Sequence, residues 1–301
     1  MIGISTSAIK SLNWKTAKSW TMSGGINKGV AHEDGNLMSS ERIRDPNVLI
    51  AFQPIERLAS ATQQDLIHLE PYAVHLWGIE LDGPPLCLER CAGWLNEAER
   101  QRAARFVRTD LQRLYMLAHG GLRAVLSRYL GVAPNHVAID RTATGKPFLT
   151  KDRQDHPTIT FNLSHAHGRA LIAVSNGQEV GIDLESVRSE VNASALSERY
   201  FSSSEHTAIM QLTQTQRAKR FFRYWVAKEA LLKAQGIGLR GLSGCEIFFE
   251  TDGANPDIHA RLGAHFTNPL QVRLLRCETG WEAAVAAPNL DRVKQYGSLM
   301  E

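Results

Sequence analysis

A strict alternation of apolar and polar residues marks a strand near the middle of the chain. The segment 179–185 reads Glu-Val-Gly-Ile-Asp-Leu-Glu, with an apolar residue at every second position. A period of two puts these apolar side chains on one face of a strand and places Gly181, Asp183 and Glu185 together on the other. The glycine on the polar face leaves room for a ligand or a second backbone to come close.

A long helix is predicted over about residues 216–235. The run lacks Pro and Gly, is rich in Ala, Leu, Lys and Arg, and stops at Gly236, as a helix with a glycine C-cap does. Glu229 and Lys233 share one face of this helix, one turn beyond Trp225. The simplest interpretation is a surface ion pair worth about 0.3–0.5 kcal/mol, beside a solvated strand face. The functional alternative is that these carboxylates and the lysine hold a divalent cation against a phosphate.

The remaining elements can be outlined from the same patterns. Strands are predicted at 74–80, 158–162, 170–174, 270–277 and 281–287, and helices over 97–108 and about 110–130. Residues 1 to about 70 show little sustained periodicity, apart from a short helical stretch near 62–70. We therefore expect a poorly ordered N-terminal extension, and we expect that deleting residues 1–65 leaves activity largely intact.

Composition is that of a folded, water-soluble protein. At 301 residues and 43% hydrophobic content, the chain can bury a full core and has room for two domains of ordinary size. No apolar run approaches the length needed to cross a bilayer, and no signal-peptide pattern opens the chain, so a cytoplasmic location without membrane contact is expected. A net charge of +3 does not by itself indicate a nucleic-acid partner. The cysteines, Cys87, Cys91, Cys245 and Cys277, lack metal-finger spacing and are expected to be reduced and chemically silent.

Four blocks carry a family resemblance when they are taken together. They are Gly145-Lys146-Pro147, Asn162-Leu163-Ser164-His165, Gly181 to Glu185, and Trp225 to Lys233. In this order they resemble the 4′-phosphopantetheinyl transferase family, specifically its surfactin-type branch, in which one chain contains two similar halves. The resemblance covers about residues 72–288.

The resemblance implies an α+β fold in which two similar α/β subdomains are related by pseudo-twofold symmetry. A faint echo between residues 123–132 and 228–237, which share a basic start, a leucine and a closing glycine, supports such a duplication. We expect an N-terminal extension (1–70), an N-terminal subdomain on the adenosine and 3′-phosphate side of coenzyme A (71–176), a C-terminal subdomain with the magnesium and catalytic motifs (177–290), and a tail (291–301).

The implied reaction transfers the 4′-phosphopantetheine arm of coenzyme A to a serine hydroxyl of an apo acyl or peptidyl carrier protein, and releases adenosine 3′,5′-bisphosphate. Asp183, Glu185 and Glu229 match the family's Mg²⁺ ligands, and carboxylates are donors that Mg²⁺ prefers. The residues expected to act in catalysis are Glu229, as ligand or as acceptor of the serine proton, and Lys233, as the cation on a pyrophosphate oxygen. Lys228 points about 100° away from Glu229 on an ideal helix, and Glu205 matches a supporting acidic position.

We expect the first half of the chain to bind the adenosine end of coenzyme A. By the resemblance, Gly145, Lys146 and Pro147 line the adenine site, with Ser164 nearby and His165 approaching the 3′-phosphate. Each motif also has a plain structural interpretation, since Gly-Lys-Pro forms turns and single histidines are commonly structural. Within the arginine-rich segment, the positions that align best with the family's basic residues are Arg102 and Arg113.

Two other classes of function remain open from the sequence. A different Mg²⁺-dependent enzyme that cleaves phosphodiesters could use the same carboxylates, although Gly145-Lys146-Pro147 and Ser164-His165 would then lack a purpose. A non-catalytic module that binds coenzyme A or carrier proteins is the third class, which loss of Asp183 or Glu229 would have favoured. The expected partners are coenzyme A and an apo carrier protein, with no nucleic acid, and we expect a monomer because the two halves supply both sides of the site.

Overall fold

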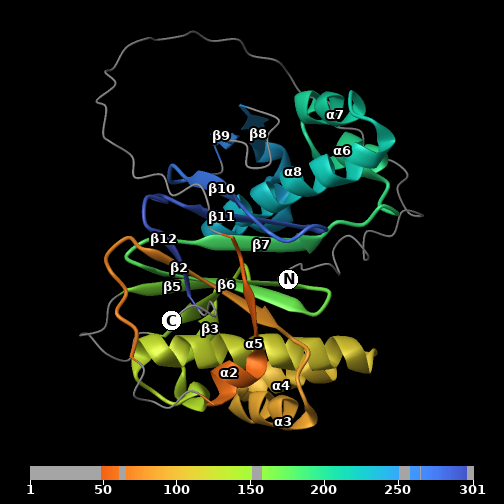
Figure 1. Ribbon diagram of the computed structural model, residues 1–301. Helices are drawn as coiled ribbons and strands as arrows, with labels where there is room; N and C mark the ends of the chain where they lie inside the picture. The colour runs from red at the N-terminus through yellow and green to blue at the C-terminus, as the bar shows by residue number, and fades with distance from the viewer. Residues whose placement is uncertain (1–48, 61–65, 151–157, 251–257, 265, 297–301) are drawn as a thin grey trace.

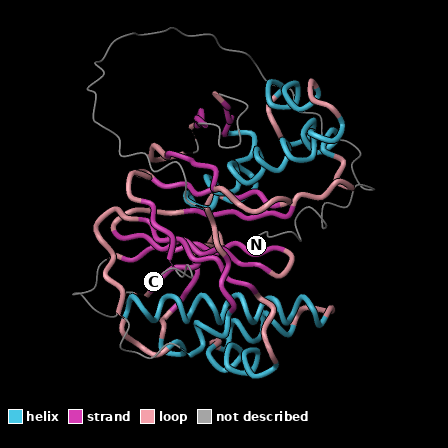
Figure 2. Tube along the Cα trace, viewed as in Figure 1, coloured by secondary structure: helices cyan, strands magenta, loops and turns pink. Residues whose placement is uncertain are grey.

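The computed structural model describes residues 49–60, 66–150, 158–250, 258–264 and 266–296. Its strands occupy the middle of the molecule, and helices cover two opposite outer sides (Figures 1 and 2). The layers follow one another as helices, a first sheet, a second sheet and a further helix layer (Figure 1). No helix in the described ranges is long and apolar enough to cross a membrane.

The first sheet contains five of the described strands, and helices cover its outer face. Its order is β1 (Phe52–Pro54), β2 (Val74–Glu80), β6 (Arg169–Asn176) and β5 (Ile159–Ala166), while β12 (Val293–Tyr296) also pairs with β2. The covering helices are α2 (Ile55–Ser60), α3 (Pro85–Trp94), α4 (Glu97–Ala104) and α5 (Thr109–Leu130). Strand β2 is antiparallel to β6, whereas the short strands β1 and β12 both run parallel to β2.

The second sheet is antiparallel and lies against helix α8. It consists of β10 (Gln271–Leu275), β11 (Trp281–Ala287) and β7 (Gly181–Ser186). Helices α6 (Ala193–Tyr200), α7 (Ser203–Met210) and α8 (Gln214–Gln235) follow β7 in the chain. The smaller elements are the pair β3 (Ile139–Arg141) and β4 (Pro147–Leu149), the pair β8 (Cys245–Phe249) and β9 (Ile258–Leu262), and the 3₁₀ turns η1 (Pro134–His136) and η2 (Gly238–Gly244).

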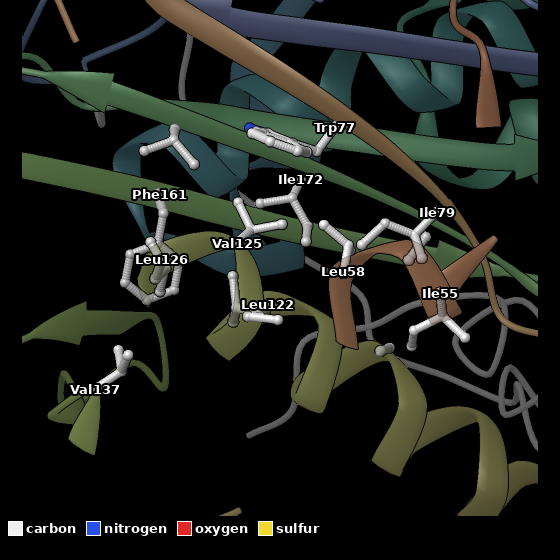
Figure 3. Close-up of a cluster of buried hydrophobic side chains, with 14 of the residues drawn as sticks. Ile55, Leu58, Trp77, Ile79, Leu122, Val125, Leu126, Val137, Phe161 and Ile172 are labelled. Atoms are coloured by element: carbon white, nitrogen blue, oxygen red, sulfur yellow. The ribbon is translucent and has the colours of Figure 1, made fainter. Parts of the chain in front are cut away.

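Three apolar clusters hold these layers together. The first joins α2, α3 and α5 to the first sheet and includes Trp77, Leu122 and Phe161 (Figure 3). The second packs α8 against the second sheet, and the third fills the space between the two sheets. Val180, Ile182 and Leu184 all belong to the third cluster, which confirms the alternation predicted for this strand.

Most of the expected elements are present with shifted ends. The helix expected over 216–235 spans Gln214–Gln235, with a Thr213 capping box at its start and Gly236 at its end in the left-handed conformation, φ 71°. The strand expected at 158–162 continues through Ser164 and His165 to Ala166. The basic helix expected over 97–108 ends at Ala104, because a turn separates α4 from α5.

The expectation of a disordered extension up to residue 70 is wrong for the described part of that segment. Strand β1 pairs with β2, and Ile55 and Leu58 of α2 point into the first cluster (Figure 3). Deleting residues 1–65 would therefore remove part of the core, contrary to the sequence-based expectation. Residues 1–48 lie outside the described ranges.

The tail expected over 291–301 is also wrong in part. Strand β12 returns to the first sheet, where Val293 pairs with Val74 and Tyr296 with Trp77. Gln295 Nε2 donates to the carbonyl of Ala51 at 2.8 Å, so the two ends of the described chain meet on one edge of β2. The expected division at residues 176 and 177 falls in the turn between β6 and β7.

Candidate active site

The polar face of β7 is turned toward α8. A Cβ atom on Gly181 would lie 2.0 Å from the carbonyl oxygen of Ala230 and 2.4 Å from the amide nitrogen of Ala234. Glycine is therefore required for the backbone of α8 to approach this strand, and of the two options left open for Gly181, a close second backbone is the one found. Asp183 and Glu185 follow on the same face and are each 1% exposed.

Lys233 joins the last turn of α8 to the middle of β7. Its Nζ lies 2.6 Å from Asp183 Oδ1 and donates to the carbonyl of Ile182 at 3.2 Å. Burial alone lowers the pKa of Lys233, but Asp183 and Glu229 outweigh it and raise that pKa above its ordinary value. The interpretation of Lys233 and Glu229 as a solvated surface pair is therefore wrong, since Lys233 is largely buried and Glu229 is 4% exposed.

The three carboxylates form one electrostatic group. Burial, and then the charge of Asp183, raises the pKa of Glu185 to about 8. Burial also raises the pKa of Glu229 to about 8, against the opposing effect of Lys233. Three oxygens, Asp183 Oδ2, Glu185 Oε2 and Glu229 Oε1, are buried without a hydrogen-bond partner among the described residues. Buried carboxylates in this state require added positive charge or protonation.

This donor set fits a magnesium ion in its chemistry. Mg²⁺ prefers hard oxygen ligands, and each of the three carboxylates retains an oxygen that makes no hydrogen bond within the described residues. Within the described ranges, no three His, Cys, Asp or Glu side chains already stand in a metal-binding arrangement. The cation that lies against Asp183 here is Lys233.

The Asn-Leu-Ser-His block on β5 connects the two sheets. Asn162 Oδ1 accepts from the Ile182 amide at 3.0 Å, and Ser164 Oγ accepts from the Leu184 amide at 3.2 Å. Ser164 Oγ also donates to Asp183 Oδ1 at 2.8 Å. Ser164 therefore lies beside the carboxylates and orients Asp183. The sequence-based assignment of Ser164 to the adenosine site does not predict this contact.

His165 lies near His119, which in turn lies within electrostatic range of Arg102 and Arg141. We call the part of the site formed by these four residues its basic side. Burial, followed by His119 and Lys233, lowers the pKa of His165 to about 3. On α5, His119 Nδ1 is 3.6 Å from Glu99 Oε1, and burial lowers the His119 pKa although Glu99 opposes that shift. Both pKa values lie below the ordinary value for histidine, so both side chains are neutral near pH 7, and a nearby anion would favour their protonated forms.

Arg102 and Arg141 contribute fixed positive charge to this side. Burial and then Arg141 lower the pKa of Arg102, so the two guanidiniums lie within electrostatic range of each other. Arg141 Nη1 donates to the carbonyl of Gly145 at 3.0 Å. Sequence reasoning missed Arg141, although it stands four residues before Gly145 in Arg-Thr-Ala-Thr-Gly-Lys. A basic residue so close to the proposed adenine-binding turn is a usable signal for the neighbouring 3′-phosphate.

Arg113 is placed elsewhere. Its Nη2 donates to the carbonyl of Gly83, which precedes α3. The structure therefore brings Arg102 together with Arg141, whereas Arg113 connects α5 to the segment before α3.

The Gly-Lys-Pro block forms the turn between β3 and β4. Gly145 has φ 88°, a conformation that favours glycine, and Pro147 begins β4. Lys146 Nζ contacts Glu179 and donates to the carbonyl of Ala234 at 2.6 Å, at the end of α8. A cavity of about 680 Å³ opens beside this lysine. Its lining residues come from both halves of the chain and include Thr142, Thr144, Gln178, Gly236 and Asn289.

Lys228 points away from the carboxylate group, as its position on the helix predicts. Its Nζ is 2.9 Å from Glu205 Oε2, and both side chains are fully buried. Glu205 Oε1 also accepts from the Ile247 amide at 2.8 Å. This pair ties α8 to α7 and β8, so its role here is to hold the helix that carries Glu229.

Comparisons with known proteins agree on one family. A model of the 4′-phosphopantetheinyl transferase superfamily matches residues 179–286, and a model of the 4′-phosphopantetheinyl transferase N-terminal region matches residues 87–177. The chain is 41% identical to 4′-phosphopantetheinyl transferase HetI of Nostoc sp. (strain PCC 7120) over 58% of this chain and 73% of that protein. It is 25% identical to 4′-phosphopantetheinyl transferase Sfp of Bacillus subtilis (strain 168) over 72% of this chain and 93% of that protein. The human L-aminoadipate-semialdehyde dehydrogenase-phosphopantetheinyl transferase is 29% identical over 54% of this chain and 55% of its own length.

Proposed function

Because the chain belongs to the 4′-phosphopantetheinyl transferase family, we propose that it transfers the 4′-phosphopantetheine arm of coenzyme A to a serine hydroxyl of an apo acyl or peptidyl carrier protein. The observation that carries the proposal is the buried group in which Lys233 lies against Asp183 while Glu185 and Glu229 approach from β7 and α8. With a divalent cation held by its carboxylates, such a group would suit a pyrophosphate, whose negative charge needs compensation.

The reaction exchanges one phosphorus–oxygen bond for another. The serine oxygen forms a bond to the phosphorus that bears the pantetheine arm, and the bond from that phosphorus to the bridging pyrophosphate oxygen breaks. Adenosine 3′,5′-bisphosphate leaves with the electron pair, and the serine proton passes to a base. Lys233 Nζ would bind a pyrophosphate oxygen and stabilise the charge that grows on the leaving group.

Asp183, Glu185 and Glu229 would hold a magnesium ion, and their unpartnered oxygens support this assignment. When bound, the ion supplies positive charge that offsets the charge of the pyrophosphate. Ser164 would keep Asp183 oriented through its 2.8 Å hydrogen bond. Glu229 Oε1 is the atom that would serve either as a ligand or as the acceptor of the serine proton.

The 3′-phosphate of coenzyme A would lie on the basic side of the site. Arg102, Arg141 and His165 support this assignment because they lie within electrostatic range of one another or of His119. Arg141 lowers the pKa of Arg102, both arginines lower the pKa of His119, and His119 lowers the pKa of His165. Gly145, Lys146 and Pro147 would line the adenine, as the resemblance implies. The position of Arg113 beside Gly83 offers no support for a phosphate contact.

The direct test is intact-mass analysis of an apo carrier protein incubated with this protein, coenzyme A and Mg²⁺. A mass gain of one phosphopantetheine arm, lost when the carrier serine is replaced by alanine and when the metal is chelated, is the expected result. Coenzyme A binding without any mass gain on fatty-acid, polyketide or peptide carriers would instead favour a non-catalytic binding protein.

A further inference from the structure

The side chain of Lys146 leaves the turn between β3 and β4 and crosses to the other half of the chain. Its Nζ donates to the carbonyl of Ala234 at 2.6 Å and contacts Glu179, and the side chain is 14% exposed. The stem lies along the end of α8, because a Cβ on Gly236 would be 3.3 Å from Lys146 Cδ. The ammonium is thus held between two acceptors of the C-terminal half.

These two acceptors lie next to the elements that carry the three carboxylates and Lys233. Glu179 precedes β7 by two residues, and Ala234 follows Lys233 directly in α8. The amide of Ala234 lies against β7, since a Cβ on Gly181 would be 2.4 Å from its nitrogen. Lys146 therefore connects the start of β7 to the end of α8 beside Lys233.

The carbonyl that binds Lys146 is one that a helix leaves unpaired. The last four carbonyls of an α-helix have no intrahelical amide to accept from, and the helix dipole favours a cation beside them. In α8 the Leu232 carbonyl accepts from the amide of Gly236. The Ala234 carbonyl accepts from Lys146 instead. Lys146 therefore fixes the last turn of α8, and Lys233 lies in that turn.

The turn that carries Lys146 also carries Arg141 of the basic side. Arg141 Nη1 donates to the carbonyl of Gly145, and the Lys146 amide donates to Thr142 Oγ1 at 3.1 Å. The Thr142 amide donates to the Lys146 carbonyl at 2.9 Å, so these residues belong to one closed turn. An anion bound by Arg141 would therefore be connected to the end of α8 through Lys146.

We propose that Lys146 is a positioning residue, which holds the last turn of α8 against the β3–β4 turn and thereby places Lys233 beside Asp183. This inference rests on the proposed transferase function, in which the Lys233 ammonium binds a pyrophosphate oxygen. The backbone of the β3–β4 turn would still line the adenine, whereas the Lys146 side chain touches α8 and Glu179 rather than coenzyme A. Loss of this side chain should therefore act through Lys233 and leave the adenine and 3′-phosphate contacts intact.

The test compares Lys146→Met and Lys146→Arg with the unmodified protein. Transfer to an apo acyl carrier protein gives kcat/KM for coenzyme A, and calorimetry gives the Kd for adenosine 3′-phosphate, which has the adenine and the 3′-phosphate but no pyrophosphate. We expect Lys146→Met to lower kcat/KM at least tenfold and to change this Kd less than twofold. Lys146→Arg keeps a cation at the end of α8, so it should retain most of the activity. Lys294→Met, at an exposed lysine on β12, is the matched control and should change neither constant.

Two results would overturn the inference. An unchanged kcat/KM in folded Lys146→Met would show that the lysine does not position Lys233. A loss of adenosine 3′-phosphate affinity as large as the loss of kcat/KM would place the lysine on the nucleotide itself. Lys146→Gln removes the same charge and replaces Lys146→Met in both comparisons if the methionine variant does not fold. If the unmodified protein transfers no arm to any carrier, the proposed function itself fails, which is a separate outcome.

Discussion

Lys233 Nζ lies 2.6 Å from Asp183 Oδ1, and this contact connects the end of α8 to the middle of β7. Both residues are largely buried, and the same oxygen of Asp183 also accepts a hydrogen bond from Ser164. A single buried lysine thus offsets part of the negative charge of three neighbouring carboxylates. In the proposed function the same lysine would also bind a phosphate, so loss of Lys233 would affect both the fold and the site.

Replacing Lys233 with Met should destabilise the protein as well as remove activity. The change leaves Asp183 buried without its cation, and breaking a buried pair in this way costs about 3–5 kcal/mol. Chemical denaturation gives the free energy of unfolding of each variant. The double variant Lys233→Met with Asp183→Asn removes the orphaned charge and should recover part of the loss. Equal stability of Lys233→Met and the unmodified protein would show that the pair contributes nothing to folding.

Gly181→Ala should be among the most damaging small substitutions in the chain. The added Cβ would lie 2.0 Å and 2.4 Å from backbone atoms of α8, which cannot move without displacing the helix that carries Glu229 and Lys233. We expect a loss of about 3 kcal/mol or more, the upper range of overpacking effects. Gly93→Ala is the control, because a Cβ there meets nothing within 4 Å on a helix, and it should be neutral or stabilising. A melting temperature for Gly181→Ala equal to that of Gly93→Ala would contradict the close packing of α8 on β7.

Removing residues 1–65 should unfold or severely destabilise the protein. The deletion takes away Ile50, Ile55 and Leu58, which are at most 4% exposed. Fully burying an aliphatic side chain of this size is worth about 1.5–3 kcal/mol, so the combined loss is comparable to the whole stability of a typical domain. Ile55→Ala should cost about 2–5 kcal/mol on the same grounds. A truncated protein that unfolds at the same urea concentration as the full chain would show that β1 and α2 are dispensable.

Stability should fall in mild acid partly because of His75. This residue is 2% exposed, and its Nδ1 is 3.0 Å from Tyr129 Oη. Burial, and then Lys294, lowers its pKa from 6.5 to about 4. The folded pKa lies below the ordinary value, so the stability contributed by neutral His75 is fully present above pH 6.5 and is lost as the pH falls toward 4. The loss reaches about 3 kcal/mol, because each pH unit that separates the folded pKa from the unfolded one corresponds to about 1.36 kcal/mol.

The control for this pH effect is a variant that cannot titrate at the same position. In His75→Gln, the decline in unfolding free energy between pH 6.5 and pH 4 should be smaller by about the same 3 kcal/mol. Other groups titrate equally in both proteins, so the difference between the two curves isolates His75. Parallel curves would mean that His75 is not held neutral by its surroundings.

The parts of the fold that sequence predicts are those with strong local patterns. The alternation around Asp183 and Glu185 and the glycine after Gln235 mark β7 and the end of α8 directly, because both signals depend only on neighbouring residues. Strands β1 and β12 are three and four residues long and pair with a strand distant in sequence, so no periodicity reveals them.

The site was predictable to a similar extent. Asp183, Glu185, Glu229 and Lys233 are brought together as the motifs indicate. The position of Ser164 beside Asp183 depends on how the edge of β5 meets β7, which only the tertiary structure fixes. Likewise, only the tertiary structure shows that Arg113 donates to the carbonyl of Gly83. Its separation from Arg102 along the chain does not reveal this.

We infer that the carboxylates and Lys233 form the centre of the proposed phosphopantetheinyl transferase reaction. The most direct measurement is the mass of an apo carrier protein after incubation with coenzyme A, Mg²⁺ and each of three variants, Asp183→Asn, Glu229→Gln and Glu250→Gln. Glu250 pairs with His259 on an exposed surface, so its variant is the matched control. We expect a gain of one phosphopantetheine arm with the unmodified protein and with Glu250→Gln, and no gain within the same time with Asp183→Asn or Glu229→Gln. Full modification by folded Asp183→Asn or Glu229→Gln would contradict the proposed role of these carboxylates.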